Sequence, residues 1–354
     1  MAATGAVGLS PDVARADECD AAGRHTEAIN HLVAGVKKND VEAYTRLGKR
    51  LLVGDRAPLL ANDGAKFLED ASARGGGEAA ALLSVLLAVG ARQQTNLRAA
   101  LASLVLAAER GWPPAREQLR VLAGPQAAPG VGGNAQADWR QLAACVDLEM
   151  WQTAPRAAVL STDPLIRSYP GFVSDPVCRW LMDKARGCLS RALVYEALIK
   201  KVTVHHTRTN SAAMFGLLET DLVCVLTQAR MAACLGTPFR HCEAMTVLHY
   251  AEGEQITEHF DFVDPNVPDY EQKVKQSGQR IVTFLVYLND DYAAGETEFP
   301  HLGVSHKGQS GEGLYFVNAL PDNSADLRTL HAGRPPMKGE KWIVSQFVRN
   351  RPMF

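Results

Sequence analysis

The stretch LHYAEGEQITEHFDF, residues 248–262, determines how the second half of this chain folds. Near its end lies His259-Phe260-Asp261, which we predict to be on a strand over residues 259–263. Side chains at positions i and i+2 of a strand point to the same face of the sheet. One imidazole and one carboxylate are therefore expected to converge from a single strand.

Further strand signals crowd around this stretch and are separated by turns rich in Gly, Pro and Asp. Short strands of this kind predict an antiparallel sandwich or barrel, and two earlier helices would cover one of its faces. The strands are expected over residues 193–206, 243–250, 259–263, 280–289, 313–318, 328–331 and 341–348, and the helices over residues 175–191 and 221–235.

Two later residues add chemistry to the pair at positions 259 and 261. His331 is expected at a strand end, and two histidines with one carboxylate on one face of a metal leave three positions open. This is the ligand set of non-haem Fe(II) oxygenases, whose iron needs open positions for a bidentate co-substrate and for O2. Lys341 begins the last strand and would project into the barrel, where its ammonium can bind the far carboxylate of 2-oxoglutarate.

The first half of the chain carries an internal repeat with a period of 36 residues (43 to 79 to 115). The pattern resembles tetratricopeptide-like helical repeats over about residues 20–123, and a plain helical bundle with accidental periodicity is the alternative. Such repeats stack into a solenoid whose concave surface usually binds protein. The aligned positions are Ala43, Ala79 and Ala115, then Leu32, Leu68 and Leu104, and the helices are expected over residues 27–36, 41–53, 64–74, 78–89, 97–110 and 114–122.

A stretch rich in Gly, Pro and Ala, residues 124–137, reads as a linker, and one more helix is expected over residues 139–151. We therefore divide the chain into a helical-repeat domain, a linker with a connecting helix, and a second domain. Their expected bounds are residues 1–123, 124–160 and 161–354.

The composition excludes several classes of protein. The chain has 354 residues, 47% of them apolar, and a net charge of -2, so it can bury a sizeable core and lacks the basic stripe of a nucleic-acid-binding protein. It has no apolar run long enough to span a membrane and no secretory signal. Seven scattered cysteines without a CxxC pair fit reduced thiols, so we expect a cytoplasmic protein.

Residues from about 160 to 354 resemble the prolyl 4-hydroxylase type of 2-oxoglutarate/Fe(II) oxygenases. The resemblance implies a double-stranded β-helix, or jelly roll. The chain as a whole is then expected to be an α+β multidomain protein, with an all-α helical-repeat array followed by a jelly roll with flanking helices. The matching motifs are LHYAEGEQITEHFDF (248–262), RIVTFLVYLND (280–290), GETEFP (295–300), LYFVN (314–318) and the spacing from His331 to Lys341-Trp342.

The resemblance assigns roles to particular residues. By motif, His259, Asp261 and His331 would bind the iron. Lys341 would pair with the C5 carboxylate of 2-oxoglutarate, and these four residues would form the catalytic centre.

Three further positions match the family less directly. Tyr250 matches a tyrosine whose hydroxyl contacts the co-substrate, and Thr297 matches a threonine near the same carboxylate, with Thr283 as the competing candidate. Arg208, in TRTNS (207–211), matches a stretch beside the substrate groove, so it is expected to contact the substrate.

The resemblance implies hydroxylation of an unactivated C–H bond with Fe(II), 2-oxoglutarate and O2, and with ascorbate as the reductant that rescues oxidised iron. The most common family target is a peptidyl proline, hydroxylated at C4, and the helical repeats could dock such a peptide or protein. A free amino acid or a natural-product intermediate is the alternative substrate. Asp261 disfavours a halogenase, which usually replaces the carboxylate ligand by a small residue.

An alternative of another class is a non-catalytic repeat scaffold with a degenerate oxygenase domain. No nucleic acid and no membrane are expected as partners, and the oligomeric state is left open.

Overall fold

The computed structural model describes residues 10–91, 94–124, 138–192, 194–196, 201–203, 207–264, 267 and 270–353. The chain divides into two compact units. The first consists of Met1–Val146 and Leu217–Val225, and the second of Asp147–Gly216 and Leu226–Phe354. The chain therefore enters the first unit a second time and leaves it along helix α10 (Leu222–Leu235).

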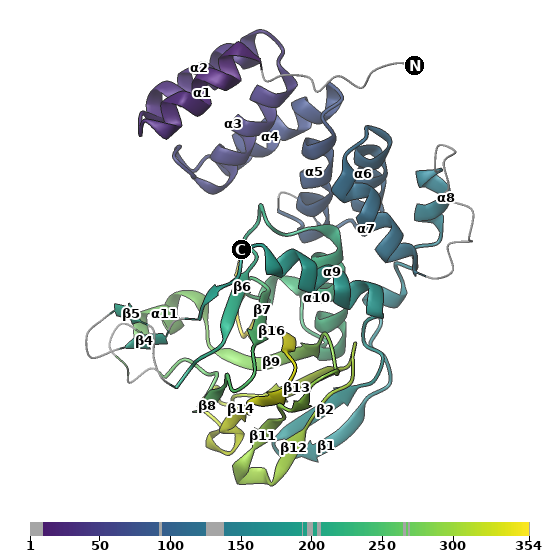
Figure 1. The fold of residues 1–354 in the computed structure, drawn as a ribbon, viewed down its shortest axis with the longest axis vertical. Coiled ribbons are helices and arrows are strands. Elements are labelled where there is room, and N and C mark those ends of the chain that lie inside the picture. The colour runs from purple at the N-terminus through teal and green to yellow at the C-terminus, as the bar shows by residue number, and fades with distance from the viewer. Residues whose placement is uncertain are drawn as a thin grey trace. The chain divides into compact units, whose positions relative to one another are not determined.

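The first unit is an array of helices in its described residues (Figure 1). The helices expected from the repeat are all present, and the helical array is confirmed. Its helices are α1 (Pro11–Ala21), α2 (His25–Lys37), α3 (Val41–Val53), α4 (Ala61–Ala73), α5 (Gly77–Val89), α6 (Leu97–Glu109), α7 (Pro113–Ala123) and α8 (Trp139–Ala144).

Local chemistry determines where these helices begin and end. At the start of α3, Asp40 Oδ1 accepts the backbone N–H of Glu42 at 3.0 Å, and at its end Gly54 adopts a left-handed conformation with φ of 73°. The small residues that align at the repeat period, Ala43, Ala79 and Ala115, are 0% exposed. Alanine at these positions lets neighbouring helices approach closely.

Two features of this unit differ from the sequence-based expectation. Helix α1, which begins after the capping residue Ser10, was not predicted. The helix predicted over residues 139–151 is wrong, because α8 ends at Ala144 and a separate 3-10 turn covers Met150–Gln152. Asp147 causes the break, since its carboxylate accepts the N–H groups of Glu149 and Met150 and so starts a new turn.

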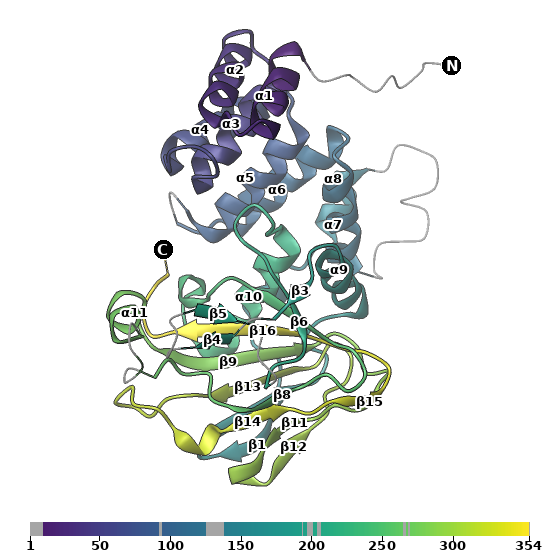
Figure 2. The ribbon, with the colours of Figure 1, turned by 60° about the vertical axis from the view of Figure 1, so that its left-hand side comes forward.

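The second unit is built on two antiparallel sheets that lie in two layers, with β16, β9 and β13 above β8, β14 and β11 in Figure 2. This arrangement agrees with the predicted jelly roll. In order across the larger sheet, the strands are β1 (Ala158–Thr162), β2 (Leu165–Tyr169), β13 (Gly313–Val317), β9 (Arg280–Tyr287), β16 (Lys341–Arg349), β7 (Thr246–Tyr250), β6 (Ser211–Met214) and β3 (Ser190–Arg191). Across the smaller sheet they are β12 (Val304–His306), β11 (Thr297–Phe299), β14 (His331–Gly333) and β8 (Ile256–His259).

Apolar side chains from both sheets meet between the layers. Leu285 and Tyr287 of β9, Leu248 of β7 and Ile343 of β16 join Phe299 of β11 in one buried cluster. Leu285 and Tyr287, two residues apart on β9, therefore face the core on the same side of their strand.

Helices and short hairpins complete the second unit. On the larger sheet, α9 (Asp175–Arg186) packs against β6 and β7, and Gln228 of α10 donates to Gln346 of β16 at 2.7 Å. The two helices thus cover one face, as predicted. The remaining elements are α11 (Tyr270–Ser277), the pairs β10 (Ala293–Ala294) with β15 (Pro336–Lys338) and β4 (Val194–Glu196) with β5 (Lys201–Thr203), and the 3-10 turns Phe239–His241, Pro300–Leu302 and Leu327–Thr329.

Three predicted elements of this unit need correction. The helix predicted over residues 175–191 ends at Arg186, and Ser190–Arg191 is already strand β3. The strand predicted over residues 328–331 begins only at its last residue, because Asp326 accepts the N–H of Arg328 and opens a 3-10 turn there. Of the strand predicted over residues 193–206, the hairpin β4–β5 is described and the rest lies outside the described residues.

No helix among the described residues is both long and apolar enough to cross a membrane.

Candidate metal centre

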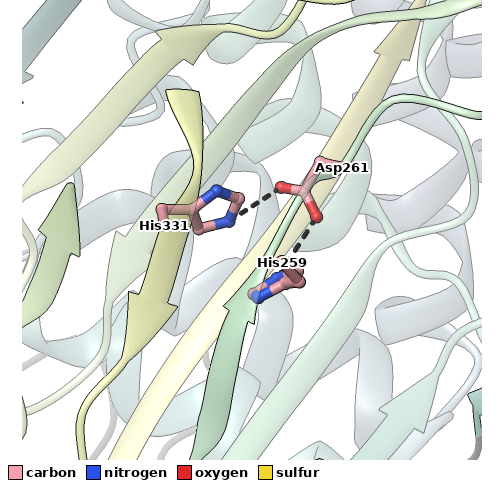
Figure 3. Close-up of side chains that lie close together, drawn as sticks. All are labelled: His259, Asp261 and His331. Carbon is pink, nitrogen blue, oxygen red and sulfur yellow. Dashed lines mark ion pairs between the residues drawn. The ribbon is translucent and has the colours of Figure 1, made fainter. Parts of the chain in front are cut away.

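Two side chains from neighbouring strands of the smaller sheet and one from the segment after β8 meet at one point (Figure 3). His259 ends β8 and His331 begins β14, and the antiparallel register places these two residues directly opposite each other. The carboxylate of Asp261 lies between the imidazoles, with Oδ1 at 3.5 Å from His259 Nε2 and Oδ2 at 3.3 Å from His331 Nε2. The structure therefore brings together the three residues for which the sequence predicted a common site.

The element that carries Asp261 differs from the prediction. The strand expected over residues 259–263 is wrong, since β8 covers Ile256–His259 and Asp261 follows it. The cause is the register, because the partner strand begins at His331 and leaves no ladder partner beyond His259. The carboxylate is thus placed by a turn after the strand.

Hydrogen bonds orient both imidazole rings in the same way. His259 Nδ1 donates to the carbonyl of Thr257 at 2.8 Å, and His331 Nδ1 donates to the carbonyl of Thr329 at 3.0 Å. A carbonyl oxygen only accepts, so Nδ1 carries a proton and Nε2 is the ring atom that can bind a metal. Both Nε2 atoms face the carboxylate, which is the arrangement that metal-binding histidines require.

The carboxyl group of Asp261 is ionised. Burial would raise its pKa, but the neighbouring His331 and His259 hold the pKa well below its usual value. Its Oδ2 also accepts a hydrogen bond from the hydroxyl of Thr283 at 2.7 Å. The site thus offers a metal two imidazole Nε2 atoms and one carboxylate oxygen.

This donor set fits Fe(II). The three ligand atoms lie within 4.8 Å of one another, so one ion can reach all of them. Two histidines and one carboxylate on one side of the ion leave positions open on the other, as non-haem iron oxygenases need.

A cavity of about 590 Å³ extends from these residues into the barrel, and Lys341 lies on its wall. Lys341 is 0% exposed, and its Nζ has no hydrogen-bond partner in the described part of the chain. Burial lowers the pKa of this ammonium to about 7. A buried cation without a hydrogen-bond partner is stabilised by an anionic ligand, and a carboxylate of 2-oxoglutarate has the required charge.

Hydroxyl groups surround this lysine. Tyr250 is paired with Lys341 across the β7–β16 ladder, and its ring centroid lies 5.1 Å from Nζ. Thr297 also lines the cavity, and its Oγ1 accepts a hydrogen bond from the hydroxyl of Tyr287 at 2.8 Å. Since the hydroxyl of Thr297 accepts this bond, its own proton is available to a ligand.

The competing threonine has a different neighbour. Thr283 does not line the cavity, and its hydroxyl binds Asp261. Thr297 therefore lies where a co-substrate contact is possible, and Thr283 lies where it can act on a metal ligand.

Arg208 lines the same cavity. An isolated β-bridge pairs it with Ile256 at the start of β8, and its Nε donates to Asn210 Oδ1 at 3.2 Å. It is half-buried, in keeping with the predicted position beside a substrate.

Sequence reasoning missed Tyr287 and Asn318, which bond to the two threonines. Both occur in stretches that were recognised, RIVTFLVYLND and LYFVN, but neither has a spacing signal of its own. Their partners depend on strand register.

The fold and the site together resemble those of oxygenases in which two histidines and one carboxylate hold iron. A family model described as the 2OG-Fe(II) oxygenase superfamily matches residues 245–349. Probable prolyl 4-hydroxylase 3 of Arabidopsis thaliana is 31% identical over 210 residues, which cover 54% of this chain and 71% of that protein. The chain belongs to the 2OG-Fe(II) oxygenase superfamily and is related to its prolyl 4-hydroxylases.

Other relatives match the same half of the chain. Prolyl 4-hydroxylase subunit alpha-1 of Gallus gallus is 30% identical over 188 residues, which are 53% of this chain and only 36% of that protein. A solved structure of a viral collagen prolyl hydroxylase from Paramecium Bursaria Chlorella virus-1 is 27% identical. It covers 52% of this chain and 95% of its own, with a TM-score of 0.40.

Proposed function

We propose that this protein is a 2-oxoglutarate- and Fe(II)-dependent hydroxylase that acts on a prolyl residue of a peptide or protein. The observation that carries the proposal is the buried, unpaired ammonium of Lys341 in the cavity that also holds the three candidate ligands. The kinship with prolyl 4-hydroxylases supports the choice of a prolyl substrate.

Each residue has a defined task in this proposal. Bound Fe(II), with 2-oxoglutarate and O2, would supply the oxidation of the C–H bond, with succinate and CO2 as co-products. His259, Asp261 and His331 would hold the metal through two Nε2 atoms and one carboxylate oxygen. Lys341 would bind the C5 carboxylate of 2-oxoglutarate, which fixes the direction in which the co-substrate lies.

Other groups of the cavity would orient the reactants. The hydroxyls of Tyr250 and Thr297 would donate to the same carboxylate, and Ile343 and Leu285 give this end of the cavity apolar walls that exclude water. Excluded water strengthens the ion pair with the lysine. Arg208, on the wall of the same cavity, would contact the peptide.

We also propose the less direct features of this enzyme. Ascorbate would return oxidised iron to Fe(II), and the helical repeats would dock the peptide or protein substrate on their concave side. A cytoplasmic location is proposed because none of the seven cysteines, all of which lie in the described residues, forms a disulfide. Neither nucleic acid nor a membrane is proposed as a partner.

Succinate formation tests the function directly. Purified protein would be incubated with Fe(II), 2-oxoglutarate and ascorbate, with and without a proline-rich peptide, and the peptide would be analysed for a mass gain of one oxygen. We expect strong stimulation by the peptide, and we expect the His259→Ala variant to lose at least 99% of the activity while it keeps its fold.

The other outcomes identify the alternatives. Turnover that no peptide stimulates would redirect the search to a free amino acid or a natural-product intermediate. A protein that neither binds Fe(II) nor forms succinate would be a non-catalytic scaffold, and full activity of His259→Ala would refute the assignment of the metal centre.

A further inference from the structure

The three candidate metal ligands are not held in the same way. His259 and His331 lie on paired strands, and each ring is fixed by the backbone carbonyl two residues before it. Asp261 lies beyond the end of β8, so no ladder hydrogen bond fixes its backbone. Side chains from outside the smaller sheet must therefore position this carboxylate.

We infer that Thr283 and Asn318 are positioning residues, which set the orientation of the Asp261 carboxylate for metal binding. The inference rests on the proposed function, because it gives these two residues a task at the same metal centre. Thr283 Oγ1 donates to Asp261 Oδ2 at 2.7 Å, and Asn318 Nδ2 donates to Thr283 Oγ1 at 2.9 Å.

Both residues are buried and tied to rigid strands. Thr283 is 1% exposed and lies within β9, and Asn318 is 1% exposed and directly follows β13. These strands pair in register, with Phe316 opposite Thr283, and Asn318 N–H donates to the carbonyl of Ile281 at 2.8 Å. The position of the threonine hydroxyl is therefore set by the larger sheet.

Asn318 also determines where the hydroxyl proton of Thr283 points. A hydroxyl has one proton to donate and two lone pairs that can accept. The amide N–H of Asn318 occupies a lone pair of Thr283 Oγ1, and the hydroxyl donates its proton to Asp261 Oδ2. A hydrogen bond to a charged acceptor is among the stronger ones in a buried site.

The Asn318–Thr283 hydrogen bonds engage Oδ2 of Asp261, and Oδ1, the oxygen 3.5 Å from His259 Nε2, is the one that would bind a metal. Binding through a single oxygen uses one coordination position, and the remaining positions stay open for the co-substrate and O2. Without the hydroxyl, the carboxylate is free to rotate about its Cβ–Cγ bond. Groups that orient a metal ligand in this way typically contribute about 10–100-fold to metal affinity.

Metal affinity in the absence of 2-oxoglutarate tests the inference, with Co(II) as the probe, by calorimetry and by the visible absorption of the bound ion. We expect Thr283→Val, which has nearly the same shape, to bind Co(II) about 10–100-fold more weakly and with an altered spectrum. Thr283→Ser keeps a hydroxyl at this position, so we expect it to keep both the Co(II) affinity and the absorption spectrum of the unaltered protein. Asn318→Ala is expected to weaken Co(II) binding less than Thr283→Val does, because the Thr283 hydroxyl remains and loses only the hydrogen bond from Asn318.

A matched control removes a buried threonine hydroxyl from the other unit of the chain. Thr45 in α3 is 2% exposed and donates only to the carbonyl of Val41 in its own helix, so Thr45→Val should bind Co(II) unchanged. Unchanged affinity in Thr283→Val, or equal weakness in Thr283→Ser, would overturn the inference, while succinate formation by the unaltered protein would leave the proposed function intact. Absence of Co(II) binding in the unaltered protein would overturn both.

Discussion

Lys341 is fully buried, and its Nζ has no hydrogen-bond partner in the described part of the chain. An unsatisfied buried polar group costs about 1–3 kcal/mol, and more when it is charged. The residue therefore weakens the ligand-free fold, and it is explained by what it binds. A lysine with this burial is a sign of function that the sequence alone could not give, because only the fold shows the absence of a partner.

The first expected result concerns Lys341→Met in the ligand-free protein. The methionine fills similar space without a charge, so the variant should be more stable by about 1–3 kcal/mol at pH 6. Because the pKa of Lys341 falls to about 7 in the fold, the unfolded chain binds more protons between that pH and its ordinary value of 10.5. The stability of the unaltered protein thus rises with pH over this range.

Denaturant titrations of both proteins from pH 6 to 10 check this result. The stability gap should narrow as the pH rises, since the native lysine becomes neutral. A gap that stays constant with pH, or a variant less stable than the unaltered protein at pH 6, would contradict the burial of a charged, unpaired lysine.

A second expectation at this residue concerns 2-oxoglutarate binding. The co-substrate requires the ammonium form, so binding above pH 7 must be accompanied by uptake of a proton at Lys341. The affinity of the Mn(II)-loaded protein should then fall about tenfold per pH unit between pH 8 and 9. Calorimetry in buffers of different ionisation enthalpy measures the proton uptake directly, and binding that releases protons would be the opposite of this expectation.

Among the elements, the helices were easier to predict than the strands. The 36-residue repeat of alanine and leucine positions marks the faces on which the helices pack. Its aligned leucines, Leu32, Leu68 and Leu104, are all buried. The short strands of the smaller sheet have no such repetition, and their ends depend on partners distant in sequence. This is why Asp261 was assigned to a strand, and why the bond from Thr283 to it could not be found.

The close approach of α3 and α4 gives a third testable result. A Cβ added to Gly64 would lie 2.5 Å from the backbone N of Leu52 and 2.7 Å from the carbonyl of Gly48. Backbone atoms of a packed helix cannot move aside, so Gly64→Ala should destabilise the protein by about 1–3 kcal/mol, although alanine is the better helix former. Thermal unfolding measures the loss.

Gly187, which follows α9, is the matched control for this substitution. Its φ is -73°, and an added Cβ meets nothing within 4 Å, so Gly187→Ala should be neutral or slightly stabilising. Equal effects of the two substitutions would show that Gly64 is not a point of helix contact.

At the scale of the whole molecule, each of the two units is formed by two separate segments of the sequence. The sequence predicted a boundary in the linker at residues 124–137, and that boundary stays a prediction. The structure adds that Leu217–Val225, within the stretch assigned to the oxygenase, folds with the first unit. Leu217 and Leu218 pack there on a buried cluster that includes Tyr44 and Leu86. No local pattern in the sequence marks this return.

One buried hydrogen bond holds the returning segment to the repeats. The side-chain oxygen of Gln118, in α7, accepts the backbone N–H of Leu222, the first residue of α10, at 3.0 Å. Gln118 is 4% exposed, so its replacement by leucine leaves a buried N–H without an acceptor, at a cost of about 1–3 kcal/mol.

Gln118→Leu should therefore lower the stability of the first unit and speed amide hydrogen exchange at Leu222 by at least about tenfold. Gln118→Glu keeps an acceptor oxygen of the same length and should preserve the protection of that amide. Equal exchange in the leucine variant and the unaltered protein would mean that the start of α10 is held by its apolar contacts alone. Faster exchange confined to the first turn of α10 would instead show that a repeat residue controls where this helix begins.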